Sequence, residues 1–486
     1  MDYKITGYEP QKLFQFFEEI CAIPRGSKNE KEVSDYLVQF AKDRGLWHYQ
    51  DELHNVIIKK EGSEGAKDLP PVMLQGHTDI VCEKLSSVEH DFAKEGLNLI
   101  VKDGVVTADG TTLGADNGVA VALMMMVLDD DTLEHPPLEC VFTTQEEIGL
   151  FGAKALDKSL IQARTMINMD SEEEGIATVS CAGGMRIGCT RKIQREEIFG
   201  TKLSISITNL LGGHSGTDIN QGRQNANLLM ARMIYHLFQN TNGGRLVAIN
   251  GGSKDNAIAR ECEALLIYED TKEAEKAEKT AIDLAEKFAD EITAWEPDFS
   301  CDIALEEGKE QAMRKEDADA MVHAMYLAPN GVQKRNMKMD GFVVTSCNMG
   351  VAATQENTVE ITFSPRSSVA SLMEELKARI ELLAKTFGFT CDFSGEYPGW
   401  SYAEESEIRE VFKESYQRLF GEELKIEALH AGLECGLFSD ALPGMDAIAV
   451  GPTICACHTP DEYLPLDSFE RFYELLKDAL KVLAEK

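Results

Sequence analysis

The sequence is poor in basic residues. Among 486 residues, 48 are Lys or Arg and 83 are Asp or Glu, which gives a formal net charge of -35 at pH 7. Such a charge repels phosphate backbones and anionic lipid headgroups. We therefore expect no nucleic-acid partner and no membrane partner. The surplus of carboxylates leaves some of them available to bind divalent cations.

Long apolar runs and targeting signals are also missing. No window approaches about eighteen uninterrupted apolar residues, and the first residues lack the basic start and apolar stretch of a secretory signal. The 12 Cys are scattered without a CxxC pair, as is typical of reduced thiols. Cys455 and Cys457 could hold a metal, but alternation along a strand explains their spacing without one. These features predict a soluble, cytoplasmic protein.

Proline is scarce, with 14 residues, and the chain lacks the compositional bias of a disordered or collagen-like protein. Hydrophobic residues make up 43% and charged residues 27%, as in ordinary globular enzymes. At roughly 150 residues a domain, a chain of 486 residues predicts two or three domains.

The first part of the sequence has the pattern of an α/β domain. Apolar residues recur at helical spacing from Glu9 to Cys21, from Asn29 to Gly45 and from Gly118 to Leu128. Short apolar segments predict strands at Asn55–Lys59, Val72–Gln75, Leu138–Thr144, Thr165–Met169 and Ala447–Val450. This alternation predicts a mainly parallel sheet flanked by helices, with ligands at the carboxyl ends of the strands.

Residues 187–396 have a different pattern, which predicts an inserted α+β lid domain. Its first half predicts strand, helix, two strands, helix and strand at Leu203–Thr208, Asn220–Leu237, Leu246–Asn250, Ala257–Tyr268, Lys272–Ile292 and Asp298–Leu305. The second half repeats much of this order, with helix, two strands, helix and strand at Lys315–Tyr326, Phe342–Met349, Thr358–Ser364, Val369–Phe387 and Thr390–Phe393. We expect two ferredoxin-like halves, and a catalytic domain split between residues 1–186 and 397–486.

Histidine and acidic residues follow several predicted strands. His77 and Asp79 follow Val72–Gln75 after a single glycine, and an imidazole beside a carboxylate suits a metal ligand whose ring the acid orients. A His and an Asp in a turn are also commonly just hydrogen-bonded. Asp116 lies before the helix that we expect from Gly118, where Asp116 and Asn117 could instead cap the helix.

Further acidic residues and a second histidine occur at later strand ends. Glu146 and Glu147 follow one strand, and because neighbouring side chains of an extended segment diverge, one can bind a metal while the other faces substrate or water. A pair of surface acids is the alternative. Asp170 and His458 follow two other strands. Together these residues favour zinc or a similar ion in a two-metal hydrolytic centre.

The motifs GHTDIV, GADNG, TTQEEIGLFGA, MINMD and CHTPDEY, in this order, resemble those of the co-catalytic zinc peptidases, the family of carnosinases, aminoacylases and carboxypeptidase G enzymes. The likeness begins at Ile23–Ser27 and is strongest to members that hydrolyse Xaa-His dipeptides. It implies two zinc ions per chain, with cobalt or manganese as substitutes, and a bridging carboxylate from Asp116. The metal ligands that it implies are His77 and Asp170 for one ion and Glu147 and His458 for the other.

The resemblance also implies catalytic roles for two acids. Glu146 matches the general base, and Asp79 matches the acid that orients His77. Many relatives have a second Asp where this chain has Asn117, but that position is not a ligand, so the number of metals is unchanged.

Three residues of the expected lid resemble substrate contacts of the family. His214 matches the lid histidine that polarises the scissile carbonyl or holds the substrate. Arg366 matches the arginine that binds the terminal carboxylate of the substrate, for which a planar two-pronged donor is apt. Asn256 is a third candidate contact. A glycine-rich turn with an exposed histidine is the alternative for His214.

The sequence therefore predicts metal-dependent hydrolysis of dipeptides with a free C-terminal carboxylate, such as Xaa-His or carnosine-like dipeptides. Two alternatives stay open, an N-acyl amino acid deacylase and a catalytically silent peptide-binding or metal-binding protein. A homodimer is one assembly that the family allows, in which His214 acts across subunits. A doubled lid would let His214 act within its own chain.

Overall fold

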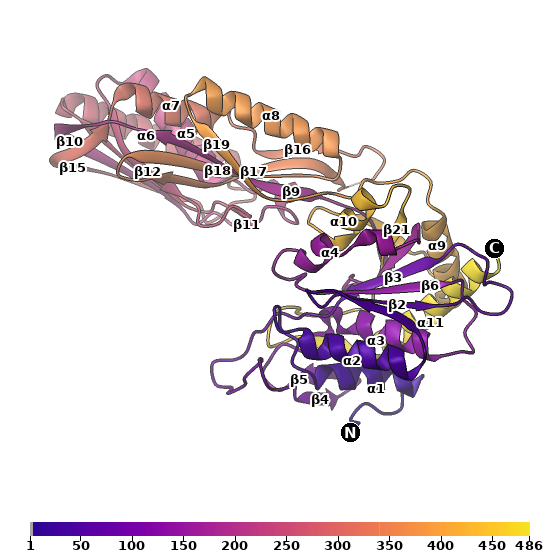
Figure 1. Ribbon diagram of the computed structural model, residues 1–486. Helices are drawn as coiled ribbons and strands as arrows, with labels where there is room; N and C mark the ends of the chain where they lie inside the picture. The colour runs from indigo at the N-terminus through magenta and orange to yellow at the C-terminus, as the bar shows by residue number, and fades with distance from the viewer. Residues whose placement is uncertain (1–2, 340) are drawn as a thin grey trace. The chain divides into compact units, whose positions relative to one another are not determined.

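The computed structural model describes residues 3–339 and 341–486 (Figure 1). The chain forms two compact units. The first contains the chain up to Cys181, Trp400–Ala428 and Leu433–Lys486, and the second contains Ala182–Gly399 and Leu429–Gly432. Each unit has a large hydrophobic core of its own.

The first unit is built on a mixed eight-stranded sheet with the order β1-β2-β6-β3-β7-β21-β8-β20. Its central strands β6, β3, β7 and β21 pair in parallel, whereas β1, β2 and β8 join antiparallel. The strands are β1 (Trp47–Gln50), β2 (Val56–Lys60), β3 (Val72–His77), β6 (Leu138–Thr143), β7 (Thr165–Asn168), β8 (Ile176–Cys181), β20 (Lys425–Leu429) and β21 (Asp446–Ala449). The α/β prediction is confirmed, with a parallel centre and antiparallel edges.

Helices cover both faces of this sheet. Figure 1 shows α1, α2 and α3 together on one face, and α4 and α10 on the opposite side. The helices are α1 (Gln11–Cys21), α2 (Lys31–Asp43), α3 (Ala115–Asp129), α4 (Phe151–Ala155), α9 (Glu407–Phe420), α10 (Glu434–Ala441) and α11 (Leu466–Ala484). Almost every residue of α3 is buried, because the helix lies between α1 and β3. A small sheet that the sequence did not predict contains β4 (Leu99–Lys102), β5 (Val105–Ala108) and β22 (Tyr463–Pro465).

The second unit is built on an antiparallel sheet with the order β15-β10-β14-β12-β17-β18-β9-β19, and β16 pairs with β17. Its strands are β9 (Gly183–Lys192), β10 (Arg195–Thr208), β12 (Arg245–Gly251), β14 (Cys262–Tyr268), β15 (Ser300–Met313), β16 (Gly331–Arg335), β17 (Val343–Thr354), β18 (Thr358–Ser367) and β19 (Thr390–Tyr397). The helices are α5 (Ala226–Asn240), α6 (Thr271–Ile292), α7 (Lys315–Leu327) and α8 (Ala370–Thr386). A separate antiparallel domain is therefore present.

Several predicted elements of this unit differ from those observed; β10, for example, begins at Arg195 and not at Leu203, and β15 continues to Met313 and not only to Leu305. The expected helix from Asn220 begins at Ala226, because the side chain of Asn225 accepts a hydrogen bond from the Asn227 amide and caps the helix there. The expected strand Ala257–Tyr268 is divided into β13 (Ala257–Ile258), which pairs with β11 (Gly213–His214), and β14.

Candidate metal centre

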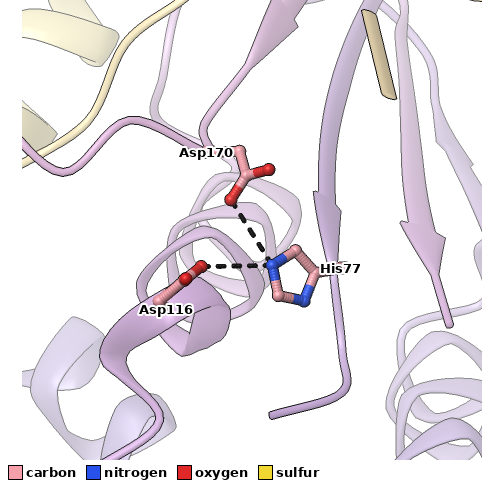
Figure 2. A group of neighbouring side chains, drawn as sticks. All are labelled: His77, Asp116 and Asp170. Atoms are coloured by element: carbon pink, nitrogen blue, oxygen red, sulfur yellow. Dashed lines mark hydrogen bonds and ion pairs between the residues drawn. The ribbon is translucent and has the colours of Figure 1, made fainter. Parts of the chain in front are cut away.

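The first candidate ligand, His77, ends the fully buried central strand β3. Its Nδ1 lies 3.0 Å from the backbone oxygen and 3.5 Å from a carboxylate oxygen of Asp79. Its Nε2 lies 3.1 Å from Asp116 Oδ1 and 3.4 Å from Asp170 Oδ1. Figure 2 shows this nitrogen directed at both carboxylates. One ring nitrogen is therefore oriented by Asp79, and the other faces the acids that could share a metal with it.

A sharp turn at the start of α3 presents Asp116. Gly114 has a φ of 66°, and a Cβ at this position would lie 2.6 Å from Ile80 and 2.9 Å from the guanidinium of Arg25. Asp116 and Asn117 have non-helical backbone angles, and the peptide bond between them is cis. The N-cap residue of α3 is Gly114, and the side chains of Asp116 and Asn117 contact His77, His458 and Asp170.

The two carboxylate oxygens of Asp116 face different histidines. Oδ1 lies 3.1 Å from Nε2 of His77, and Oδ2 lies 3.1 Å from Nε2 of His458. His458 Nε2 is also 3.0 Å from Oε1 of Glu147. Asp116 thus belongs to two groups of potential ligands, one with His77 and Asp170 and the other with Glu147 and His458. A carboxylate shared in this way can bridge two cations.

The acidic pair after β6 is held in a turn by Asp79. Oδ1 of Asp79 accepts a hydrogen bond from the Glu146 amide at 3.0 Å, and Oδ2 of Asp79 accepts one from the Glu147 amide at 3.3 Å. Ser27 donates a third hydrogen bond to Asp79 at 2.8 Å. Because the backbone is fixed in this way, both glutamates stay beside His77. The pair is therefore not an arrangement of two solvated surface acids.

The electrostatics of the cluster are those of a site that attracts cations. Burial lowers the pKa of His77, but Asp170, Asp116 and Asp79 outweigh it and raise that pKa well above the usual value. Hydrogen bonds with Asp116 and Glu147 raise the pKa of His458 to about 11. Burial raises the pKa of Glu146 well above its usual range. The acids of the cluster thus favour protonated imidazoles, and divalent cations would replace the protons on these rings.

Three buried charged residues near the cluster were not identified as site residues from the sequence. Glu434, at the start of α10, accepts hydrogen bonds from Gln75 and, at 2.6 Å, from Thr143. Burial raises the pKa of Glu434 to about 7. Glu462 and Arg25 bind the backbone of the turn that carries Asp116. Glu462 and Arg25 lie in sequence segments that resemble those of the family, and this resemblance is the only sequence signal that could have identified them as site residues.

The three predicted substrate contacts belong to the second unit. Arg366 lies on β18 and is 7% exposed, and its guanidinium donates a hydrogen bond to the Tyr397 hydroxyl at 2.9 Å. Arg366 and Asn256 line the same pocket of about 360 Å³, together with Arg186 and Lys254. Asp255 also lines this pocket and Arg186 pairs with Glu360 at 3.1 Å, so Arg366 and Lys254 are the cations that favour a small anionic group there.

His214 has a defined hydrogen-bonding pattern within the same unit. Its Nδ1 accepts hydrogen bonds from the amides of Gly216 at 3.3 Å and Thr217 at 3.2 Å. Burial, followed by the charge of Arg366, lowers the pKa of His214. A neutral imidazole that accepts at Nδ1 carries its proton on Nε2. His214 therefore has an N–H with which it can donate to a substrate oxygen.

Comparison with known proteins identifies the class. Residues 73–482 match the model of peptidase family M20/M25/M40, so the chain belongs to this family. It is 34% identical to the cytosol non-specific dipeptidase of Escherichia coli (strain K12), over 99% of this chain and 100% of that protein. The family resemblance and the prediction of a hydrolase of the metallopeptidase class are confirmed.

Solved structures show the same relationship. Aminoacylhistidine dipeptidase from Vibrio alginolyticus superposes with a TM-score of 0.93 at 34% identity, which covers 99% of this chain and 98% of that one. The aminopeptidase PepT from Bacillus cereus shares the fold, with a TM-score of 0.56 at 17% identity over 99% of this chain and 100% of that one.

In the part of the chain that the structure describes, no helix is both long and apolar enough to cross a membrane.

Proposed function

We propose that the protein hydrolyses dipeptides with a free C-terminal carboxylate, with Xaa-His and carnosine-like dipeptides among its substrates. The observation that carries the proposal is the division of the Asp116 carboxylate between His77 and His458. This division is what a centre with two cations requires. The names of the two relatives that are 34% identical support a dipeptide substrate.

The residues present fit two divalent ions. Imidazole nitrogens mixed with carboxylate oxygens suit zinc, with cobalt or manganese as substitutes. Oε1 of Glu147 is buried and lies 3.0 Å from Nε2 of His458, the nitrogen with which it could share a cation. We propose that His77, Asp116 and Asp170 hold one ion and that Asp116, Glu147 and His458 hold the other. When bound, such ions lower the pKa of water and stabilise negative charge on oxygen.

Glu146 is the proposed general base. Its backbone is fixed by Asp79, but its carboxylate belongs to neither of the two proposed ligand sets. The raised pKa of Glu146, caused first by burial, suits a group that takes a proton from water and later gives it to the leaving amine. Asp79 holds His77 and the glutamate turn together, so that the base and the ligands keep their geometry.

The second unit supplies the proposed substrate contacts. Arg366 binds the terminal carboxylate, and Asn256 lines the same pocket. His214 donates its Nε2–H to the scissile carbonyl and stabilises the oxyanion that forms. We propose that this unit is a lid made of two ferredoxin-like halves. In support, β15-β10-β14-β12 and β19-β9-β18-β17 each have the strand order of that fold, and they are joined through β12 and β17.

We also propose the domain boundaries 1–186, 187–396 and 397–486, and a cytoplasmic location, which the name of the Escherichia coli relative supports. A doubled lid would let His214 act within its own chain, whereas a homodimer would let it act across subunits. Size-exclusion chromatography with light scattering distinguishes a monomer from a dimer.

An N-acyl amino acid deacylase is the alternative, because it would use the same cations and base. The decisive experiment is metal analysis of the purified protein, followed by a dipeptide panel that includes β-alanyl-histidine. Each dipeptide is paired with its N-acetyl analogue. We expect two metal equivalents and faster hydrolysis of the free dipeptides. A preference for the acetylated analogues would identify a deacylase, and a protein that binds metal but hydrolyses neither would be a silent binder.

A further inference from the structure

Glu462 makes an unusual set of hydrogen bonds inside the first unit. Its side chain is 2% exposed, and it accepts hydrogen bonds from consecutive backbone amides of another segment. Oε2 accepts from Leu113 at 2.8 Å and from Gly114 at 3.0 Å. Oε1 accepts from Ala115 at 2.8 Å and from Asp116 at 3.4 Å. One carboxylate thus binds every amide of the turn that ends at Asp116.

A backbone carbonyl of this turn is bound by Arg25, which is 1% exposed. Its guanidinium donates to the carbonyl of Gly114 at 2.6 Å and to that of Thr78 at 2.9 Å. Thr78 directly follows His77. The turn is therefore held through its amides by a buried anion and through its carbonyl by a buried cation, and the same cation contacts the segment after β3.

Glu462 is also firmly attached to its own segment. Its amide donates to Thr459 at 3.1 Å, its carbonyl accepts from Thr107 at 2.9 Å, and β22 begins at the next residue. His458 belongs to the same short segment. A displacement of Glu462 would therefore alter the Asp116 turn and the His458 segment together.

We propose that Glu462 is a positioning residue that fixes the two oxygens of Asp116 between His77 and His458. The inference rests on the proposed two-cation site. Removal of the carboxylate frees the turn, so that Asp116 no longer holds its oxygens at both positions. The site should then keep its ligand residues but lose affinity for metal, since residues that orient ligands typically contribute about 10- to 100-fold to metal affinity.

The test compares Glu462→Gln with two control variants. Gln keeps the shape of the side chain but turns an N–H group toward amides that need an acceptor. Asp461→Asn removes a charge from the exposed neighbouring residue. Leu464→Ala removes a fully buried side chain from β22 and loosens the segment without removing a hydrogen bond to the turn. If Glu462→Gln does not fold, Glu462→Asp, which keeps the charge on a shorter side chain, replaces it.

The first measurement is hydrogen exchange of the metal-free protein, followed by mass spectrometry of peptides that contain residues 113–116. We expect exchange at least about tenfold faster in Glu462→Gln, because hydrogen bonds to a charged acceptor are lost. The second is competitive zinc titration, in which we expect affinity to fall about 10- to 100-fold. Asp461→Asn should match the wild type in both.

Two results would overturn the proposal. The first is that Glu462→Gln has the same hydrogen exchange and the same zinc affinity as the wild type. The other is an equal change in Leu464→Ala, which would show general loosening of the segment. Failure of the proposed function looks different, since the wild type itself would then bind fewer than two zinc ions or hydrolyse no dipeptide. The exchange measurement needs no metal and separates the two cases.

Discussion

Asp79 and Glu146 are joined through the backbone, since the carboxylate of Asp79 accepts the amide hydrogen of Glu146 at 3.0 Å. The same carboxylate group approaches Nδ1 of His77. One buried acid therefore fixes both a proposed metal ligand and the proposed base. Its pKa is lowered because hydrogen bonds from His77, Ser27 and Glu146 outweigh burial, so Asp79 stays ionised.

We expect Asp79→Asn to weaken zinc binding about 10- to 100-fold and to lower kcat as well, because the amide group disturbs both His77 and the glutamate turn. Zinc titration and steady-state kinetics check this expectation. Ser27→Ala is the matched control, since it removes a single hydrogen bond to Asp79 and should have a smaller effect. An Asp79→Asn enzyme with unchanged zinc affinity and kcat would contradict the role of Asp79.

Glu146→Gln should lower kcat by about a hundredfold or more, the usual contribution of a general base, while two metal equivalents stay bound. The carboxamide keeps the size of the side chain but cannot accept the proton from water. Turnover and metal content are measured on the same preparation. Glu173→Gln, which removes an exposed carboxylate, is the control and should behave as the wild type. Near-normal turnover in Glu146→Gln would sink the assignment.

Asp116→Ala should lose most of its affinity for both ions, because each oxygen of this residue serves a different ligand group. Activity should disappear with the metal. Equilibrium dialysis with zinc measures the stoichiometry, and thermal unfolding with and without zinc shows whether metal still stabilises the fold. Tight binding of two equivalents by the variant would show that Asp116 does not bridge.

Arg366→Lys should lower kcat/KM for dipeptides by roughly ten- to a hundredfold, while carboxyamidated dipeptides should lose much less. Lys keeps the charge but loses the two-pronged geometry, and a charged hydrogen bond contributes about 1.5–3 kcal/mol. Arg186→Lys is the control, because Arg186 lines the same pocket but already pairs with Glu360 at 3.1 Å. Equal losses for acid and amide substrates would place Arg366 outside the carboxylate pocket.

Glu434→Gln should change the pH dependence of stability in metal-free protein. Burial raises the pKa of Glu434 from 4.5 to about 7, so the folded protein holds this proton more tightly than the unfolded chain. The resulting stabilisation is complete below pH 4.5 and is lost as pH rises to about 7. It amounts to at most about 3 kcal/mol. Urea unfolding in chelator from pH 5 to 8 should show a flatter profile for Glu434→Gln, and parallel profiles would show that Glu434 does not titrate in this range.

The sequence predicted the central strands because each is a short apolar run. Several candidate ligands lie at the ends of those runs, and the family resemblance implied the full set. His77 at the end of β3 and Asp170 after β7 are examples, and the structure brings both to Asp116. The roles of these residues, the substrate contacts and the domain boundaries stay predictions. The edge strands β1 and β20 were missed, since they are short and none of their residues is buried.

Glu434 and Glu462 could not be assigned roles from the sequence for a different reason. Glu434 contacts Gln75, which is 359 positions away, and no local pattern reports such a contact. Glu462 lies in the motif CHTPDEY, but its partners are backbone amides, which every residue except proline has. Only the fold shows which amides need an acceptor.

The place of β21 between β7 and β8 has a consequence for synthesis. Residues 169–445 must be translated before β21 can pair with β7, which takes on the order of tens of seconds at typical ribosomal speeds. Until then the edge of β7 lacks its parallel neighbour, and His458 has not been made. A nascent chain therefore cannot assemble the His458 half of the centre, so hydrolytic competence should arise only near the end of translation.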